Sequence, residues 1–122
     1  MQTDSIDNPS TRLSIVIPAY NAARCIGNAL SSIHTALPTS HYAELEILVV
    51  DDGSDDGVEL EKIVACVPSA KIIKHQNNRG MCAARNSGIA ASCGEYVTLL
   101  DADDEFVDDW FSVFRKVLAE WP

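Results

Sequence analysis

Short apolar segments alternate with amphipathic segments along most of the chain, and this alternation constrains the fold more than any other feature. Four segments have the length, β-branched residues and flanking breakers of buried strands; they are Leu13–Ile17, Ile47–Val50, Lys71–Lys74 and Tyr96–Leu100. Each is followed by apolar residues spaced three and four apart, which predicts helices over 22–37, 58–67, 81–92 and after a cap at Asp108. Pro18, Pro38 and Pro68 are expected to end the first strand and the first two helices.

Continuous apolar strands joined by helices form parallel sheets with right-handed crossovers. The sequence therefore predicts an α/β fold, a Rossmann-like open and mostly parallel sheet with helices on both faces. In such sheets ligands bind beyond the carboxyl ends of the strands, where the strand order reverses. Three of the predicted strand ends carry polar or aromatic groups, at 18–21, at 51–52 and at 101–104.

The length of 122 residues fits one domain, predicted over 12–122, with a polar N-terminal extension over 1–11 and a polar loop over 39–43. There is no signal-peptide pattern and no apolar run long enough for a spanning helix, so we expect a cytoplasmic protein, with a peripheral position at the inner face of the membrane as a further expectation. The four cysteines lack metal-type spacing and are expected to be small buried thiols rather than zinc ligands or disulfides.

The net charge of −9 argues against nucleic acid as a partner, because phosphates require a basic surface. The acidic residues are clustered. Six of the 18 lie between Asp51 and Glu61 and six more between Asp101 and Asp109. Both clusters follow predicted strands.

The apolar strand that ends at Leu100 runs directly into Asp101, Asp103 and Asp104. Carboxylates this close repel each other, and oxygen ligands with open positions suit Mg²⁺ or Mn²⁺ better than zinc. The alternative is a solvated turn before the next helix, because Asp-x-Asp tripeptides are common in loops.

Three other residues are candidates for the site, and two of them, Tyr20 and Arg85, have a structural alternative. Tyr20 offers a flat ring for stacking a base, or it is a packed aromatic at a strand end. Asp52 can accept a hydrogen bond from an imide N–H such as that of uracil. Arg85 could lie near a diphosphate, or it could form a structural salt bridge with Asp51, Asp52 or Asp101.

Four ordered motifs together resemble glycosyltransferase family 2, a large family with the GT-A fold that uses nucleotide sugars. They are Val-Ile-Pro-Ala-Tyr-Asn at 16–21, Glu-Ile-Leu-Val-Val-Asp-Asp-Gly-Ser-Asp-Asp at 46–56, Asn-x-Gly-x-x-x-Ala-Arg-Asn-x-Gly at 78–88, and Gly-Glu-Tyr at 94–96 leading to Asp-Ala-Asp-Asp at 101–104. The resemblance covers about residues 12 to 120. It implies the nucleotide-binding half of a GT-A fold and an inverting hexosyltransferase that acts in cell-envelope polysaccharide synthesis.

The resemblance also implies roles for residues. Pro18, Tyr20 and Asp52 look like the nucleoside pocket, Arg85 lies in the helix near the diphosphate, and Asp101 looks like a ribose or sugar ligand. The metal, Mn²⁺ or Mg²⁺, is expected on Asp103 with Asp104 as a second ligand, where it neutralises the departing phosphates. The full set expected to bind the nucleotide sugar is Pro18, Ala19, Tyr20, Asn21, Asp51, Asp52, Asn78, Gly80, Arg85, Asp101 and Ala102.

The expected partners are a nucleotide-diphosphate sugar, by default a UDP-sugar, and a saccharide or lipid-linked acceptor. Family members carry the acceptor site and the catalytic base in a C-terminal half, and no residue here matches them. We therefore expect this chain to bind UDP with Mn²⁺ and to show little turnover alone. Apolar surface that a C-terminal half would cover is expected to favour self-association. The segment 36–42 also departs from the family's pattern, and the change is expected to affect only a surface loop.

Three other functions come into question for this sequence. A phosphoacceptor receiver domain needs an acidic pair after its first strand, where this chain has Pro18-Ala19-Tyr20. A calcium loop starting at Asp52 fails because its twelfth position is Ile63 rather than glutamate. A catalytically inactive binding or assembly module with the same fold remains an alternative to the enzyme.

Overall fold

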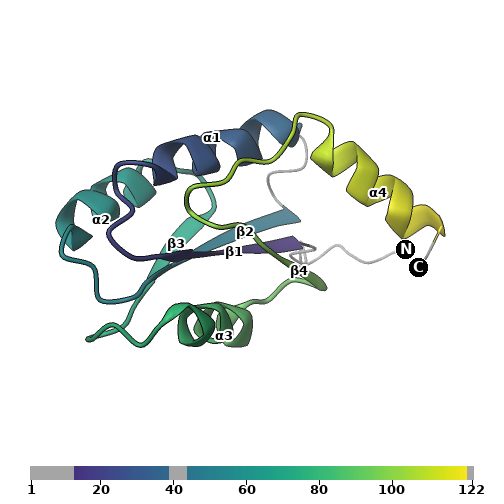
Figure 1. The fold of residues 1–122 in the computed structure, drawn as a ribbon. Helices are drawn as coiled ribbons and strands as arrows, with labels where there is room; N and C mark the ends of the chain where they lie inside the picture. Colours follow the sequence, from purple (N-terminus) through teal and green to yellow (C-terminus); the bar gives the residue numbers. More distant parts are fainter. Residues whose placement is uncertain (1–12, 39–43, 121–122) are drawn as a thin grey trace.

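The computed structural model describes residues 13–38 and 44–120 (Figure 1). The extension predicted over 1–11 and the loop predicted over 39–43 lie outside the described residues. No helix in the described part of the chain combines the length and apolar character needed to cross a bilayer.

Strands and helices alternate throughout, as predicted. The elements are β1 (Leu13–Ala19), α1 (Ile26–Ala36), β2 (Leu45–Asp51), α2 (Gly57–Ala65), β3 (Ala70–Lys74), α3 (Met81–Ala91), β4 (Tyr96–Leu99) and α4 (Trp110–Glu120). The four strands form one sheet in the order β3-β2-β1-β4, and every neighbouring pair is parallel. The predicted α/β sheet is confirmed.

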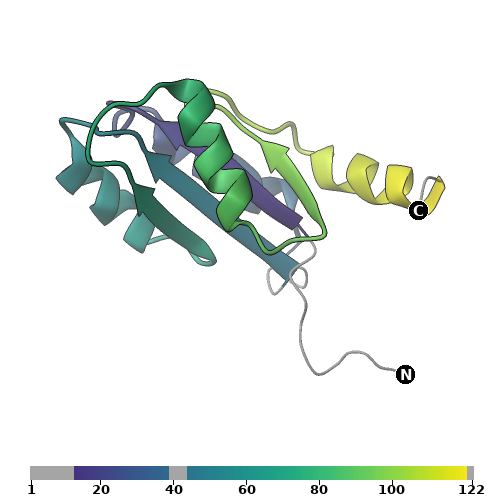
Figure 2. The same cartoon turned by 90° about the horizontal axis from the view of Figure 1, so that it is seen from below.

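The strand order places the topological switch point between β1 and β4. The chain moves outward from β1 to β3 and then returns across the sheet to β4. Because right-handed crossovers that run in opposite directions lie on opposite faces, α1 and α2 cover one face and α3 covers the other (Figures 1 and 2). The carboxyl ends of β1 and β4 therefore border the crevice where such sheets bind ligands.

Helix α3 lies close to the sheet because its inward residues are small. Its two buried positions are Ala84 and Gly88, one turn apart. A Cβ atom at Gly88 would lie 2.3 Å from Cγ1 of Val16, which is far inside van der Waals contact. Ala84 packs with Val16, Leu48 and Val50 in the small apolar cluster on this face. The larger core lies on the opposite face, against α1 and α2.

Pro18 does not end the first strand, contrary to the prediction. β1 continues to Ala19, and Pro18 is paired with Val50 of β2. The carbonyl of Val16 accepts a hydrogen bond from the N–H of Leu100, and that of Ala19 accepts one from the N–H of Asp52. Alternate residues of β1 therefore direct their backbone groups toward β4 and toward β2. The backbone groups of Pro18, like those of Val16, point toward β4. The pairing of β1 with β4 ends at Val16, so the N–H that proline lacks is not needed for a hydrogen bond between these strands.

Two smaller predictions are also wrong. The carbonyl of Asp109, not of Asp108, accepts the first helical hydrogen bond of α4, from Val113. All four cysteines are free, as expected, but Cys66, Cys82 and Cys93 are exposed rather than buried. They lie at or near helix ends and turns, where helical spacing does not reveal which side faces the solvent.

Candidate functional site

The loops that follow β1 and β2 are joined by hydrogen bonds at the carboxyl edge of the sheet. The backbone N–H of Asn21 donates to Oγ of Ser54 (3.0 Å), and the side-chain oxygen of Asn21 accepts from the N–H of Asp55 (2.8 Å). The N–H of Ala23 donates to Oδ2 of Asp56 (3.0 Å). Asn21, predicted to bind the nucleotide, therefore holds the two loops together, with a left-handed φ of 53°.

Tyr20 lies at the end of β1 and its side chain is free to meet a ligand. The residue is 50% exposed, although it follows Ala19, which is 3% exposed. An aromatic ring left this open beside the switch point provides a surface for stacking a base. The alternative, a packed strand-end aromatic, does not describe this side chain.

Asp51, the last residue of β2, has a structural contact. It is 4% exposed, and its Oδ1 accepts a hydrogen bond from the backbone N–H of Ser54 (2.9 Å). The turn it closes contains Gly53, whose φ of +75° disfavours other residues. A Cβ at Gly53 would lie 2.6 Å from the backbone nitrogen of Asn78, so glycine also permits the loop after β3 to approach.

Asp52 is the most highly connected acidic residue of the site. It is 3% exposed, and Oδ1 accepts from the backbone N–H of Arg79 (2.9 Å) and lies 2.7 Å from Nδ1 of His75. Oδ2 accepts from the N–H of Gly80 (2.8 Å). Burial by itself would raise the pKa of Asp52, but the hydrogen bonds from His75, Arg79 and Gly80 outweigh it and hold the pKa below its usual value of 3.8.

The start of α3 is built around these bonds. Gly80 has a φ of 97°, and its carbonyl accepts the first helical hydrogen bond, from Ala84 (3.0 Å). Because its N–H is already bonded to Asp52, Gly80 has no backbone donor left for a phosphate. Asn78 is exposed at the tip of the same loop. The structure thus brings Asn78 close to Gly53 and bonds Gly80 to Asp52, so that Gly80, predicted to bind the nucleotide sugar, has an internal partner.

Arg85 forms a salt bridge with Asp101 across the switch point. Its Nη2 lies 3.2 Å from Oδ1 of Asp101, and the two side chains are 33% and 39% exposed. Nε of Arg85 is buried and has no partner among the described residues. One of the two alternatives, the ion pair with Asp101, is therefore present.

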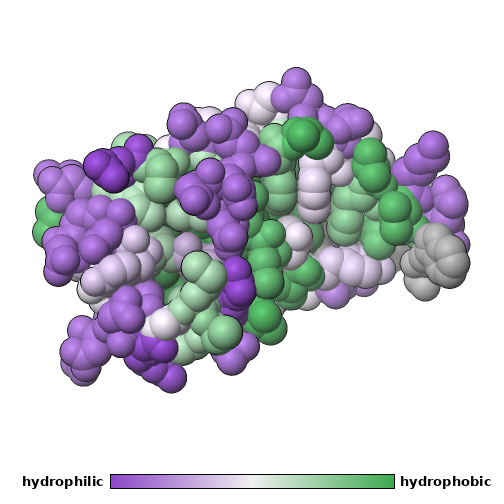
Figure 3. Space-filling model, in the orientation of Figure 1, coloured by the Kyte–Doolittle hydropathy of each residue, from purple (hydrophilic) through white to green (hydrophobic). Residues whose placement is uncertain are grey.

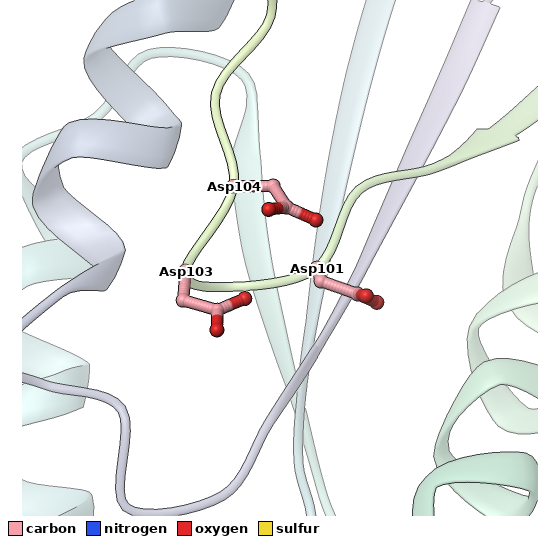
Figure 4. A group of neighbouring side chains, drawn as sticks. All are labelled: Asp101, Asp103 and Asp104. Carbon is pink, nitrogen blue, oxygen red and sulfur yellow. The ribbon is translucent and has the colours of Figure 1, made fainter.

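Asp101, Asp103 and Asp104 form the only group of three acidic, histidine or cysteine side chains in the described residues that could hold a metal ion. Their ligand oxygens lie within 4.8 Å of one another. Figure 4 shows all three on the loop that follows β4. The carbonyl of Asp101 accepts a hydrogen bond from the N–H of Asp104 (3.0 Å), and Ala102 between them is buried.

The cluster has the chemistry of a hard divalent ion. Opposite oxygens of an octahedral Mg²⁺ or Mn²⁺ site lie about 4.2 Å apart, so a small side-chain rotation would bring these oxygens to coordination distance. Asp103 and Asp104 are exposed, while Asp101 is engaged by Arg85. The two exposed carboxylates therefore fit a metal that keeps several positions open for water or phosphate.

Two hollows lie away from these residues. One of about 520 Å³ lies between α4 and the start of β1 and is lined by Leu13, Phe111 and Phe114. One of about 660 Å³ lies between α1 and the end of α2. Neither is lined by a residue predicted to bind the nucleotide sugar, and Glu44, in the first, is the one carboxylate among their lining residues.

His75 and Ser87 are the residues that sequence analysis missed. The His75 ring bridges Oδ1 of Asp52 and Oγ of Ser87, at 2.7 and 2.8 Å. A histidine directly after the predicted strand Lys71–Lys74 was the available signal, since polar or aromatic groups also follow the other three predicted strands. Ser87 carries no local signal, because it lies within a helix.

The comparisons with known proteins agree with this geometry. The family model described as Glycosyl transferase family 2 matches residues 14–121. An uncharacterized glycosyltransferase of Escherichia coli K12, YibD, is 40% identical over 93% of this chain and 32% of its own length. An uncharacterized glycosyltransferase of Rickettsia conorii is 38% identical over 90% of this chain and 18% of its own length. The chain thus spans a third or less of these relatives.

Solved structures also resemble this chain, at lower sequence identity. Staphylococcus aureus TarS 1-349 in complex with UDP-GlcNAc has a TM-score of 0.78 and 25% identity, over 89% of this chain and 31% of that chain. The mannosyltransferase PcManGT of Pyrobaculum calidifontis, in complex with GDP-Man and Mn²⁺, has a TM-score of 0.75 and 26% identity, over 98% of this chain and 36% of that chain.

Proposed function

The chain belongs to glycosyltransferase family 2, and we propose that it forms the donor-binding half of an enzyme that transfers a sugar from a nucleotide-diphosphate sugar to an acceptor hydroxyl. One observation carries the proposal. The exposed ring of Tyr20 and the carboxylates of Asp101, Asp103 and Asp104 border the same switch point of a parallel sheet. An open aromatic surface and a hard-metal cluster are the two groups that a nucleoside diphosphate requires.

The proposed donor is a UDP-sugar. The structure of TarS with UDP-GlcNAc supports uridine, whereas PcManGT binds GDP-Man, so the fold accommodates either base in different proteins. In this chain a base stacked on Tyr20 would lie beside Asp52. The protein itself donates three hydrogen bonds to the carboxylate of Asp52, two to Oδ1 and one to Oδ2. The second lone pair of Oδ2 is left to accept a hydrogen bond from an imide N–H.

Asp103 and Asp104 are the proposed metal ligands, for Mn²⁺ or Mg²⁺. When bound, the metal would supply Lewis-acid stabilisation of the charge that develops on the leaving diphosphate. Arg85, whose side chain is 33% exposed, would add positive charge on the side of α3. The carboxylate of Asp101, held by Arg85, would accept hydrogen bonds from ribose or sugar hydroxyls.

The acceptor side of the reaction is proposed to lie on a part of the protein other than the described residues. A single displacement needs groups on both faces of the anomeric carbon and a surface that excludes water from the donor. The described site supplies one of these faces. A saccharide or a lipid-linked saccharide is the proposed acceptor, and the general base has no candidate among the residues described.

Calorimetry of UDP binding tests the proposal. The folded chain is expected to bind UDP in the presence of Mn²⁺ and to lose about tenfold or more in affinity in Asp103→Asn, because a metal ligand matters at least as much as its supporting groups. Asp108→Asn is the matched control, since Asp108 is an exposed carboxylate on the same segment and outside the metal cluster. No affinity in a folded sample, or equal affinity in the two variants, would contradict the proposal.

A second candidate, an assembly module that binds the nucleotide without turnover, is favoured by one observation. Edge strand β4 pairs with β1 alone among the described strands, and its residues Val97 and Leu99 are 38% and 43% exposed. Val113 and Val117 of α4 are also exposed, and Figure 3 shows hydrophobic surface gathered on the half of the molecule that carries α4. We propose that the edge of β4 pairs with the same strand of a second copy of the chain at high concentration.

A further inference from the structure

We propose that His75 is a positioning residue for nucleotide binding, acting through Asp52 on the loop that begins α3. The inference rests on the proposed function and deepens it. It assigns a role to a buried imidazole that neither the metal cluster nor the exposed ring of Tyr20 explains.

His75 is held by one hydrogen bond of its backbone and two contacts of its ring. Its backbone N–H donates to the carbonyl of Asp51 (2.9 Å), which extends the pairing of β3 with β2 by one residue. Its side chain is 6% exposed, with Nδ1 2.7 Å from Asp52 and Nε2 2.8 Å from Oγ of Ser87. One ring therefore connects the ends of β2 and β3 with the second turn of α3.

The direction of the hydrogen bond to Asp52 follows from the chemistry of the acceptor. An ionised carboxylate only accepts, and the pKa of Asp52 is held below its usual value, so Nδ1 of His75 carries the proton. The hydroxyl of Ser87 can donate or accept, so it satisfies Nε2 in either protonation state of the ring. The Nδ1–H to carboxylate bond is the constant element.

Asp52 passes this orientation on to the start of α3. Its two oxygens accept from the N–H groups of Arg79 and Gly80, so rotation of the carboxylate would release one or both. His75 is the only side chain that bonds this carboxylate among the described residues. Loss of the imidazole would free the carboxylate to turn, and with it the loop next to Tyr20 and the helix that carries Arg85.

Two amide substitutions test the contributions of the two ring nitrogens of His75 separately. The side-chain nitrogen of asparagine lies close to the position of Nδ1, and that of glutamine close to the position of Nε2. His75→Asn should keep the bond to Asp52 and bind UDP with Mn²⁺ within about threefold of the wild type. His75→Gln should keep the contact with Ser87 and lose about tenfold or more, as expected for a hydrogen bond to a charged group. Ser87→Ala should behave like His75→Asn.

Nuclear magnetic resonance supplies a readout that a general loss of stability would not move. In the wild type, Nδ1 of His75 should be protonated in ¹⁵N spectra, and the amide protons of Arg79 and Gly80 should resonate downfield. His75→Gln should shift both amide signals upfield, while His75→Asn should leave them near their wild-type positions. An unprotonated Nδ1 in the wild type would overturn the inference even if no variant folds.

The outcomes separate this inference from the proposed function. A folded wild-type protein without affinity for UDP overturns the proposed function, while the amide signals still test the role of His75. Equal losses of affinity in His75→Asn and His75→Gln, or unchanged amide signals in His75→Gln, overturn the positioning role and leave the proposed function standing.

Discussion

The substitution Gly88→Ala tests how the close approach of α3 to the sheet sets up the site. The added Cβ would lie 2.3 Å from Cγ1 and 3.1 Å from Cγ2 of Val16. Carbon atoms prefer about 3.5–4.0 Å, so relief requires a movement of about 1 Å. Val16 is fully buried in β1, a strand paired on both sides, so we expect the helix to move rather than the strand.

The magnitude is the difference between two opposing effects. Overpacking in a core costs about 1–3 kcal/mol, and replacing a helical glycine with alanine contributes about 1 kcal/mol of helix propensity. We expect a net loss of up to about 2 kcal/mol in the free energy of unfolding, which lowers Tm by up to about 10 °C for a domain of this size. A shift of α3 by about 1 Å would also take Arg85 out of hydrogen-bond range of Asp101, which is now 3.2 Å away.

Thermal unfolding and UDP calorimetry measure the two effects. Gly27→Ala is the matched control, because Gly27 lies in the first turn of α1, is exposed, and has nothing within 4 Å of its Cβ position. We expect this control to raise Tm slightly and to leave affinity unchanged, whereas Gly88→Ala should lose about tenfold in affinity. Adding Val16→Ala to Gly88→Ala should recover part of the loss, with a coupling energy of about 1 kcal/mol or more. A Gly88→Ala protein as stable as Gly27→Ala would refute the reasoning.

Three further predictions concern the stacking surface, acid stability and self-association. Tyr20→Ala should weaken UDP binding by about tenfold or more in calorimetry, because base stacking on an aromatic ring contributes about 1–3 kcal/mol, while its half-exposed ring predicts little change in Tm. The lowered pKa of Asp52 should stabilise the fold fully above about pH 5 and lose that contribution as pH falls below its usual value of 3.8, so urea unfolding should show the gap between wild type and Asp52→Asn shrinking in acid; a gap that widens would contradict this. Light scattering should rise with concentration in the wild type and less in Leu99→Lys, and a strict monomer at high concentration would exclude the proposed pairing of β4.

The order of elements was predictable because it depends on local patterns. Apolar runs bounded by breakers and the three-and-four spacing of helices are properties of neighbouring residues, and they located all eight elements to within a few positions. The carboxylates after β4 were predictable for the same reason, since an apolar strand that runs into charge must end at the surface. The strand itself is half exposed rather than buried, because it lies at the edge of the described sheet. The parallel sheet followed from the alternation and from crossover handedness, whereas the position of the switch point came only from the observed strand order.

The roles of individual polar residues were decided by tertiary contacts. Asp52 and Asp103 are the same residue type and each follows a strand, but Asp52 is 3% exposed and bonded to residues more than 20 positions away, while Asp103 is open to solvent. Sequence alone cannot distinguish a carboxylate that the fold itself has hydrogen-bonded from one that is open to solvent, because both are acceptors at the end of a strand. Only the folded chain shows which acceptor its own N–H groups have already occupied.

By itself, then, the sequence determined the strands, the helices, the edge of the sheet where polar chemistry gathers, and the family to which the chain belongs. The tertiary structure decided that Pro18 lies inside β1, that Gly80 donates to Asp52, and that His75 connects three elements. The physical reason is range. Periodicity and turn chemistry act over a few residues, whereas the partner of a buried polar group is chosen by packing between segments far apart in the chain.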